Sequence, residues 1–139
     1  MAELFHGTIP ADDDTFFRRW VSEIEPTLAA ATFVHDWPAR QAALAEIRGD
    51  VAERVEFYWH GIELGNGFTE LTDGDELRAR FDESAAVRRA LGRAPHPVDE
   101  GVVSASARMP RSAGIAIGVD RLVMAIVGEA DIARVRVSG

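Results

Sequence analysis

The sequence contains no cysteine and no long apolar run, and both absences remove classes of protein. Without cysteine the chain has no disulfide, no thiolate metal site and no thiol nucleophile. The lack of disulfides is typical of a protein in the reducing cytoplasm. No apolar run approaches the roughly 20 residues that cross a bilayer, and the first residues lack the basic and apolar regions of a signal peptide. We therefore expect a cytoplasmic protein without a membrane segment.

Positive charge is also scarce. The 139 residues include 15 basic and 23 acidic side chains, which gives a formal net charge of −8. Because nucleic acids are bound through basic surfaces, this balance argues against direct nucleic-acid binding. The hydrophobic content of 47% and the charged content of 27% are typical of a globular protein, and the length is that of one ordinary domain. We expect residues 1–139 to form a single domain.

Helical and strand patterns alternate irregularly along the chain, which favours an α+β fold with an antiparallel sheet flanked by helices. Apolar side chains at helical spacing, Phe16, Phe17 and Trp20, are expected in the core. Thr72 and Asp75 have the spacing of a capping box at the start of a helix. The expected elements are helices over 12–26, 39–48, 72–92, 98–109 and 119–128, and strands over 31–36, 52–59, 62–70, 112–118 and 133–137.

The stretch VEFYWHGIELGNGFTEL, residues 55–71, has the pattern of a β-hairpin, although it carries three carboxylates. His60-Gly61 matches a two-residue turn, because glycine adopts positive φ readily. A core excludes carboxylates unless they are paired or bind something, so their presence raises the question of a ligand. The expected cross-strand pairs are Trp59 with Ile62, Tyr58 with Glu63, and Phe57 with Leu64.

In this register Glu56 and Glu63 lie on one face with Tyr58, diagonal to each other and roughly 7–8 Å apart at Cα. Two carboxylates at that spacing repel unless a cation or proton lies between them. Their oxygens suit Mg²⁺, especially one that also holds a phosphate. The alternative is that both carboxylates lie on a solvated sheet face and bind nothing.

Asn66, Phe68 and Glu70 also alternate, but ideal pairing would place them on the face opposite the first two carboxylates. Gly65 and Gly67 flank the asparagine, and glycines inside a strand often mark a bulge or the close approach of a ligand. A bulge at 65–67 would bring all these side chains to one pocket. The alternative is a glycine-rich strand end with an exposed glutamate.

Two long stretches resemble one enzyme family. The sequence AERVEFYWHGIELGNGFTEL resembles a catalytic segment of lysine-type class II aminoacyl-tRNA synthetases, and GIAIGVDRLVMAIVG resembles motif 3 of that class. Two others, ATFVHDWPARQAAL and PHPVDEG, resemble a short lysyl-synthetase paralogue, the elongation factor P lysine ligase. The resemblance covers about residues 12–130 and implies part of a class II synthetase catalytic fold.

The resemblance implies roles toward ATP and Mg²⁺. Glu56 and Glu63 would hold Mg²⁺ that bridges the phosphates of ATP. Arg121 would be the catalytic motif 3 arginine, lying near the adenine and the terminal phosphate. Gly118 would let the backbone approach the nucleotide. A cation and a fixed arginine suit a departing pyrophosphate.

The resemblance also implies the substrate and the reaction. Asn66, Phe68 and Glu70 would line a lysine pocket, with the Glu70 carboxylate pairing with the ε-ammonium group. The lysine carboxylate would attack the α-phosphate of ATP and give lysyl-adenylate and pyrophosphate. The protein would contribute positioning and charge neutralisation, without a covalent enzyme intermediate.

Residues 1–50 contain no counterpart of motif 1 or motif 2 of the family. We therefore expect the C-terminal half of an adenylation site, inactive alone, with an exposed sheet edge. It would belong to a lysine ligase, to a non-catalytic paralogue that binds lysine and ATP or a partner protein, or to a structural partner of another chain. The expected partners are lysine, ATP, elongation factor P or a chain supplying the missing half, and a second copy in a homodimer. The acidic surface favours elongation factor P over tRNA as the acceptor.

Overall fold

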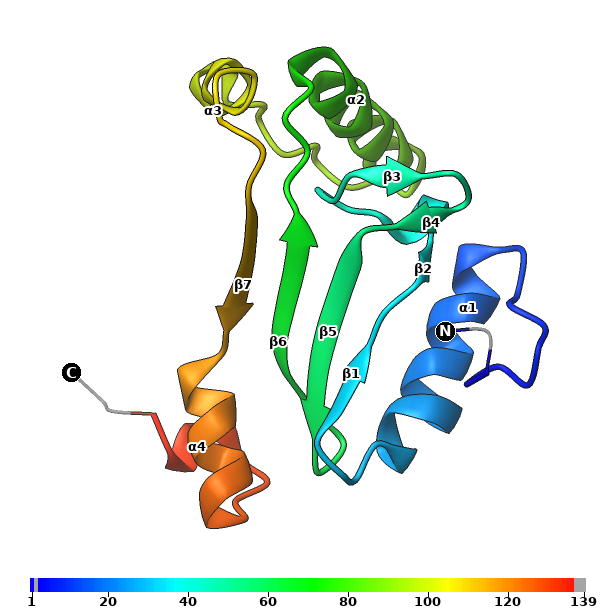
Figure 1. Ribbon diagram of the computed structural model, residues 1–139, viewed down its shortest axis with the longest axis vertical. Helices are drawn as coiled ribbons and strands as arrows, with labels where there is room; N and C mark the ends of the chain where they lie inside the picture. The colour runs from blue at the N-terminus through cyan, green and yellow to red at the C-terminus, as the bar shows by residue number, and fades with distance from the viewer. Residues whose placement is uncertain (2, 137–139) are drawn as a thin grey trace.

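The computed structural model describes Met1 and residues 3–136 and shows a four-stranded antiparallel sheet with helices around it (Figure 1). The strand order is β1-β5-β6-β7, so the hairpin strands lie in the middle and the other two at the edges. Helices around an antiparallel sheet confirm the α+β class. The strands are β1 (Thr32–Val34), β5 (Arg54–Trp59), β6 (Ile62–Thr69) and β7 (Ala113–Ile117).

The central hairpin forms around the expected turn. At His60-Gly61 both residues have positive φ, 54° and 71°, which is the geometry of a two-residue turn that matches the strand twist. The two cross-strand pairs next to the turn, Trp59 with Ile62 and Tyr58 with Glu63, are those predicted.

The bulge lies closer to the turn than predicted. Phe57 pairs with Gly65, so Leu64 is an extra residue in β6 and the predicted pair of Phe57 with Leu64 is wrong. The two strand glycines serve a different purpose. A Cβ atom on Gly67 would lie 2.8 Å from the carbonyl oxygen of Gly114 in β7, closer than real Cβ atoms approach. The glycines therefore allow β7 to lie against β6, and the irregularity expected at 65–67 occurs just before them.

The N-terminal helical segment covers one face of the sheet. Phe16 and Trp20 are buried, as predicted, but Phe17 is 47% exposed and its expected place in the core is wrong. Neighbouring residues on a helix point about 100° apart, so Phe16 and Phe17 cannot both face the sheet. The segment consists of α1 (Asp13–Arg19), a π-helical turn η1 (Trp20–Ile24) and a 3-10 turn η2 (Glu25–Thr27).

Residues 39–48 do not form the expected helix. Only Ala39–Gln41 forms a short 3-10 turn (η3), and Ala43 has a positive φ of 51°. The carbonyl oxygens of Ala43 and Ala45 each accept a hydrogen bond of 2.8 Å from Arg80, which takes acceptors that a helix would use internally. Tertiary contacts therefore override the helix propensity of the alanines. Around this segment lies a small sheet of β2 (Trp37–Pro38), β4 (Val51–Ala52) and β3 (Ile47–Arg48).

Aromatic side chains dominate the core between the N-terminal segment and the sheet. The ring centroid of Trp20 lies 4.9 Å from that of Trp37 and 5.8 Å from that of Tyr58. Such tilted aromatic contacts add to the free energy of burying the rings. The buried members of this cluster are Phe5, Phe16, Trp20, Ile24, Leu28, Val34, Trp37, Ala42, Ala45, Ala52 and Tyr58.

The later helices begin close to the predicted positions. Asp73 caps the first of them by accepting from the backbone N–H groups of Asp75 and Glu76, so the predicted capping role of Thr72 is wrong. The prediction of a strand over 133–137 is wrong for residues 133–136, because the chain makes a 3-10 turn at Ile132–Arg134. Val137 lies outside the described residues. None of the described helices is long and apolar enough to cross a membrane. The elements are α2 (Gly74–Ala90), α3 (Glu100–Ser106), α4 (Val119–Val127) and η4 (Ile132–Arg134).

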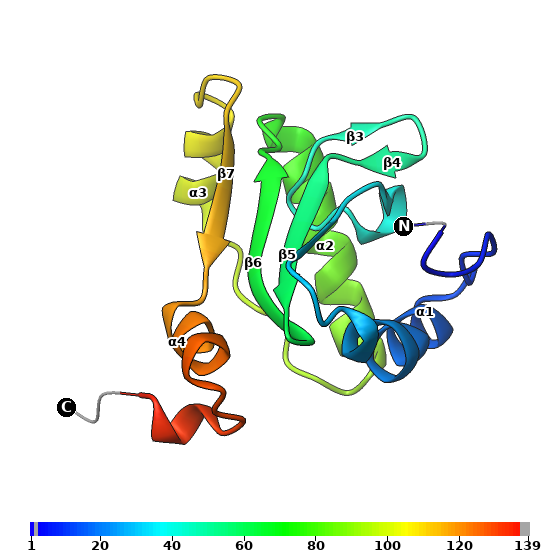
Figure 2. The same ribbon diagram turned by 60° about the horizontal axis from the view of Figure 1, so that its bottom comes forward.

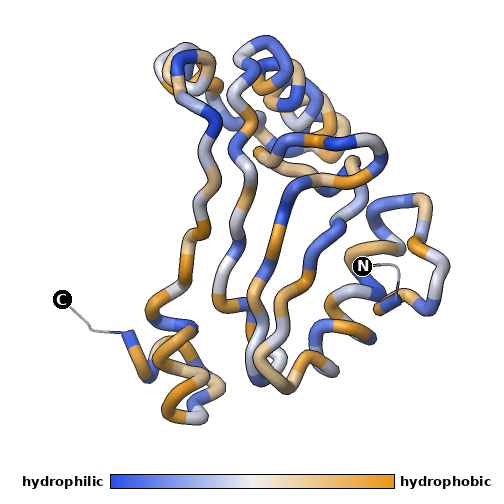
Figure 3. Tube along the Cα trace, viewed as in Figure 1, coloured by the Kyte–Doolittle hydropathy of each residue, from blue (hydrophilic) through white to orange (hydrophobic). Residues whose placement is uncertain are grey.

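One part of the fold is poorly covered. In Figures 1 and 2, α4 lies apart from α1, α2 and α3, at the lower end of β7. Every residue of β7 is exposed, including Ile115 and Ile117, and so are Val119, Ile126 and Val127 of α4. Figure 3 shows this run of apolar residues along β7 and α4. The exposed sheet edge expected from the sequence is therefore present at β7.

Candidate functional site

The bulge at Leu64 assembles the site. One extra residue in β6 reverses the face on which the rest of the strand points. Without it, the asparagine and phenylalanine of β6 would lie opposite Glu63. The register therefore places Glu63, Asn66 and Phe68 on one face, although the bulge lies at a different residue than predicted. That these side chains form one pocket stays a prediction. The cross-strand pairs on this face are Tyr58 with Glu63, Glu56 with Asn66, and Arg54 with Phe68.

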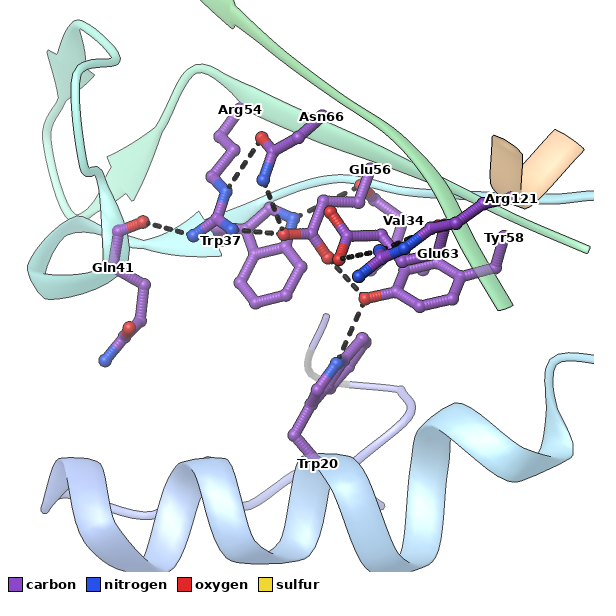
Figure 4. Close-up of polar contacts among 10 residues, drawn as sticks. All are labelled: Trp20, Val34, Trp37, Gln41, Arg54, Glu56, Tyr58, Glu63, Asn66 and Arg121. Carbon is purple, nitrogen blue, oxygen red and sulfur yellow. Dashed lines mark hydrogen bonds and ion pairs between the residues drawn. The ribbon is translucent and has the colours of Figure 1, made fainter. Parts of the chain in front are cut away.

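Glu56 lies in the middle of this face and is only 3% exposed. Its carboxylate accepts hydrogen bonds from the guanidinium of Arg54, the hydroxyl of Tyr58 and the Nδ2 of Asn66, the last at 2.9 Å (Figure 4). Burial raises the pKa of Glu56, whereas the Tyr58 hydrogen bond and the Arg54 charge act in the opposite direction. A buried carboxylate is tolerated here because it has protein donors on both oxygens.

Tyr58 links this carboxylate to the aromatic core. Its hydroxyl donates to Glu56 and accepts a hydrogen bond of 3.1 Å from Nε1 of Trp20 on the helical segment. Burial raises the pKa of Tyr58, and the hydrogen bond to Glu56 adds to the rise. The phenol therefore remains a donor to the carboxylate at neutral pH.

Arg54 is a largely buried cation that the sequence reasoning missed. Its guanidinium stacks over the Trp37 ring at 4.3 Å and donates to the carbonyl oxygen of Gln41 at 2.8 Å. The available signal was the strand period: Arg54, Glu56 and Tyr58 occupy every second position of one strand and so share a face.

Glu63 and Arg121 meet at the more exposed side of the site. Nη1 of Arg121 donates to the backbone oxygen of Glu63 at 3.0 Å and to its Oε2 at 3.3 Å. Gly118 forms the N-cap of α4, and its N–H donates to the carbonyl of Leu64 at 2.9 Å, which ties the start of the helix to the bulge. The structure thus brings the predicted residues Glu63, Gly118 and Arg121 together.

A hollow opens beside this ion pair. It measures about 610 Å³ and is lined by Glu25, Glu63, Arg121, Met124 and Ile132, among others. Burial raises the pKa of Glu25, and the nearby charge of Glu63 raises it further. With Asp131, which also lines it, the hollow combines three carboxylates, one guanidinium and an apolar wall.

Glu70 lies just beyond β6, on the same side of the sheet. A Cβ atom on Gly114 would lie 3.6 Å from Oε1 of Glu70, and Gly114 pairs with Phe68, which places the carboxylate on the face of Phe68 and Asn66. The Glu70 carboxylate has no ion pair within the described part of the chain. It is therefore available to a cationic ligand.

The two carboxylates predicted to hold Mg²⁺ differ in their fit to a metal ion. Both oxygens of Glu56 already accept from protein donors, so this carboxylate does not fit direct coordination as it is arranged. Glu63 fits a cation whose remaining ligands come from a nucleotide, as is common for Mg²⁺. Among residues 1 and 3–136, no group of three or more His, Asp or Glu side chains forms a metal site. Joint coordination by Glu56 and Glu63 stays a prediction.

Comparison with known families agrees with the geometry. The class II tRNA synthetases (D, K and N) match residues 11–137. The chain belongs to this family. It is 46% identical over 115 residues to the elongation factor P–(R)-β-lysine ligase of Proteus mirabilis, and 48% identical over 120 residues to the ligase of that name from Erwinia tasmaniensis.

These alignments cover most of the chain but a minor part of each relative. They include 78% and 81% of the chain, and 35% and 37% of the two ligases. The chain thus spans about a third of the length of these curated relatives. The resemblance to class II synthetases and to the ligase paralogue is confirmed, whereas the roles of the individual side chains remain predictions.

Proposed function

We propose that this chain carries the amino-acid pocket and part of the nucleotide site of an ATP-dependent class II ligase that activates lysine or a lysine isomer. The observation that supports the proposal most is the bulged hairpin. It sets Glu56, Glu63 and Asn66 on one face, with Arg121 bonded to Glu63 and the carboxylate of Glu70 next to Gly114 of β7.

The amino-acid side of the proposed site is acidic and partly apolar. The Glu70 carboxylate would pair with the terminal ammonium of the substrate, because it has no other cation among the described residues. Phe68, partly buried against the core, would form a wall for the methylene chain. Asn66 would orient the polar end of the amino acid. This combination selects a long cationic side chain by charge and length.

The nucleotide side lies at the hollow next to Glu63 and Arg121. The guanidinium of Arg121 is about half exposed, with 49% of its side chain accessible, so it can exchange its bond to Glu63 for one to a phosphate. The substrate carboxylate attacks the α-phosphate of ATP, which gives an aminoacyl-adenylate and releases pyrophosphate. The side chains contribute by holding the two reactants in line and by placing positive charge where negative charge develops.

The acceptor of the activated amino acid is proposed to be elongation factor P. Two similar proteins carry the name elongation factor P–(R)-β-lysine ligase. The net charge of −8 also disfavours tRNA as a direct ligand of this chain. Lysine and (R)-β-lysine share the terminal ammonium that Glu70 would bind, so both are tested as substrates.

We further propose that catalysis needs phosphate contacts that these 139 residues do not supply. Arg121 is the only arginine bonded to Glu63 among the described residues, and loss of one electrostatic stabiliser of a transition state typically costs about 10²–10³ in rate. The relatives are about three times as long as the matched region. The chain alone is expected to bind its ligands weakly and not to turn over.

The test is pyrophosphate exchange into ATP that depends on lysine or (R)-β-lysine. We expect none for the chain alone. Exchange is expected when the unmatched part of the Proteus ligase is added as a second polypeptide, and Arg121→Ala should abolish it. Ligand binding without exchange in any combination would favour the non-catalytic paralogue. Robust exchange by the chain alone would contradict the half-site account, and absence of all binding would contradict the proposed function.

A further inference from the structure

Arg54 lies directly under the proposed amino-acid site, although none of the predicted roles includes it. Only 13% of its side chain is exposed. Its acceptors come from three separate segments: the carbonyl of Gln41 in η3, the carboxylate of Glu56 in β5 and Oδ1 of Asn66 in β6. Stacking on Trp37 holds the guanidinium plane from below. One side chain therefore connects both hairpin strands to the loop beside them (Figure 4).

The contacts of Asn66 allow one orientation of its amide. Its Oδ1 accepts from Nε of Arg54 at 3.3 Å, and its Nδ2 donates to Oε1 of Glu56 at 2.9 Å. A guanidinium can only donate and an ionised carboxylate can only accept. A flipped amide would place NH₂ against Arg54 and oxygen against Glu56, so neither bond would form. The second N–H of Asn66 and the second lone pair of Oδ1 then point in fixed directions.

We propose that Arg54 is a positioning residue that fixes the amide of Asn66 and the carboxylate of Glu56 before any ligand binds. The fixed amide presents one donor and one acceptor to the polar end of a bound amino acid, a step that rests on the proposed function. Pre-organised polar groups improve affinity because no ordering is needed on binding. A lysine side chain at position 54 cannot replace the arginine, since one ammonium group cannot bond to three acceptors that lie in different directions.

The test uses the full ¹⁵N-labelled chain without ligand and follows the side-chain NH₂ of Asn66 by NMR. Arg54→Lys keeps the charge but removes the planar fork. Arg78→Lys is the matched control, because Arg78 pairs with the exposed Glu100 at the surface. Loss of a hydrogen bond to a charged group should speed exchange of the Asn66 NH₂ hydrogens with water about ten- to hundredfold in Arg54→Lys. Arg78→Lys should leave the exchange unchanged.

A second readout is the Kd for lysine, which should rise about tenfold in Arg54→Lys and stay constant in Arg78→Lys. An Asn66 amide that exchanges equally in wild type and in folded Arg54→Lys overturns the positioning role. The amide effect without lysine binding by the wild type supports positioning and contradicts only the proposed function. If Arg54→Lys does not fold, the wild type decides: hindered rotation of the Arg54 Nη groups supports the proposal, and free rotation overturns it.

Discussion

Glu56 and Glu63, which lie diagonally on one face of the hairpin on either side of the bulge, have opposite surroundings. Glu56 is buried and accepts from three side-chain donors, with aromatic rings beneath it. Glu63 is 30% exposed in its side chain and pairs with one exposed arginine on α4, a helix with much uncovered apolar surface. One side of the site is therefore held rigidly before a ligand arrives, whereas the other is open to exchange its partners.

The largest expected effect comes from removing the buried carboxylate. Glu56→Ala leaves the largely buried guanidinium of Arg54 without its counter-ion, so we expect a loss of about 3–5 kcal/mol in the free energy of unfolding. Glu63→Ala breaks a surface ion pair and should cost less than about 1 kcal/mol. Urea unfolding of both variants measures the difference. Equal losses would mean that the two sides of the site are built alike.

The second-largest loss of stability is expected where β7 packs against β6. Gly67→Ala would place a Cβ atom 2.8 Å from the carbonyl oxygen of Gly114, a backbone atom that cannot move aside alone. We expect it to push β7 away and to destabilise the chain by about 1–3 kcal/mol. Gly65→Ala is the milder control, since its nearest atoms lie at 3.2–3.3 Å and two of them are flexible isoleucine carbons. A Gly67→Ala variant as stable as the wild type would contradict the close packing of β7.

On the open side, Arg121→Ala should separate binding from stability. Loss of a charge-assisted bond to phosphate should weaken magnesium-dependent ATP binding about tenfold or more. The free energy of unfolding should change by less than about 1 kcal/mol, because the pair with Glu63 is at the surface. Calorimetric titration with MgATP measures the change in binding, and urea unfolding measures the change in stability. A large loss of stability without a loss of ATP binding would make Arg121 a structural residue.

The smallest effect concerns pH. Burial raises the pKa of Glu56 above the ordinary value of 4.5, so the folded state binds more protons than the unfolded state between that value and the raised pKa. Stability should therefore fall as the pH rises through this window. The same profile for Glu56→Gln should lack this contribution. Identical pH profiles for the wild type and Glu56→Gln would show that the carboxylate titrates normally.

Local patterns in the sequence were enough to predict the hairpin, its turn and the motif 3 strand and helix. His60-Gly61 specified the turn, and alternation specified which β5 residues share a face. These features depend on residues that are neighbours in the sequence, so the sequence alone predicts them. The family resemblance supplied Gly118 and Arg121 at α4 and the roles of the candidate residues on the hairpin.

The features that sequence reasoning missed depend on contacts between distant segments. The glycines of β6 predict a bulge when only the sequence is considered, but they accommodate β7, which follows 46 or more residues later. The alanines of 39–48 favour a helix locally, but Arg80 of α2 binds their carbonyls. The strand period places Arg54 on the face of Glu56, but its burial depends on stacking with Trp37, which lies in another strand.

The central claim is that this face of the sheet binds an amino acid with a terminal ammonium. Calorimetric titration of lysine into the wild type and Glu70→Gln tests it most directly. Norleucine, which lacks the terminal ammonium, is the control ligand, and ATP binding is the control for the rest of the site. We predict that lysine binds and norleucine does not, and that Glu70→Gln weakens lysine binding about tenfold or more while ATP binding is unchanged. Equal binding of lysine and norleucine, or an unchanged Kd for lysine in Glu70→Gln, would contradict the claim.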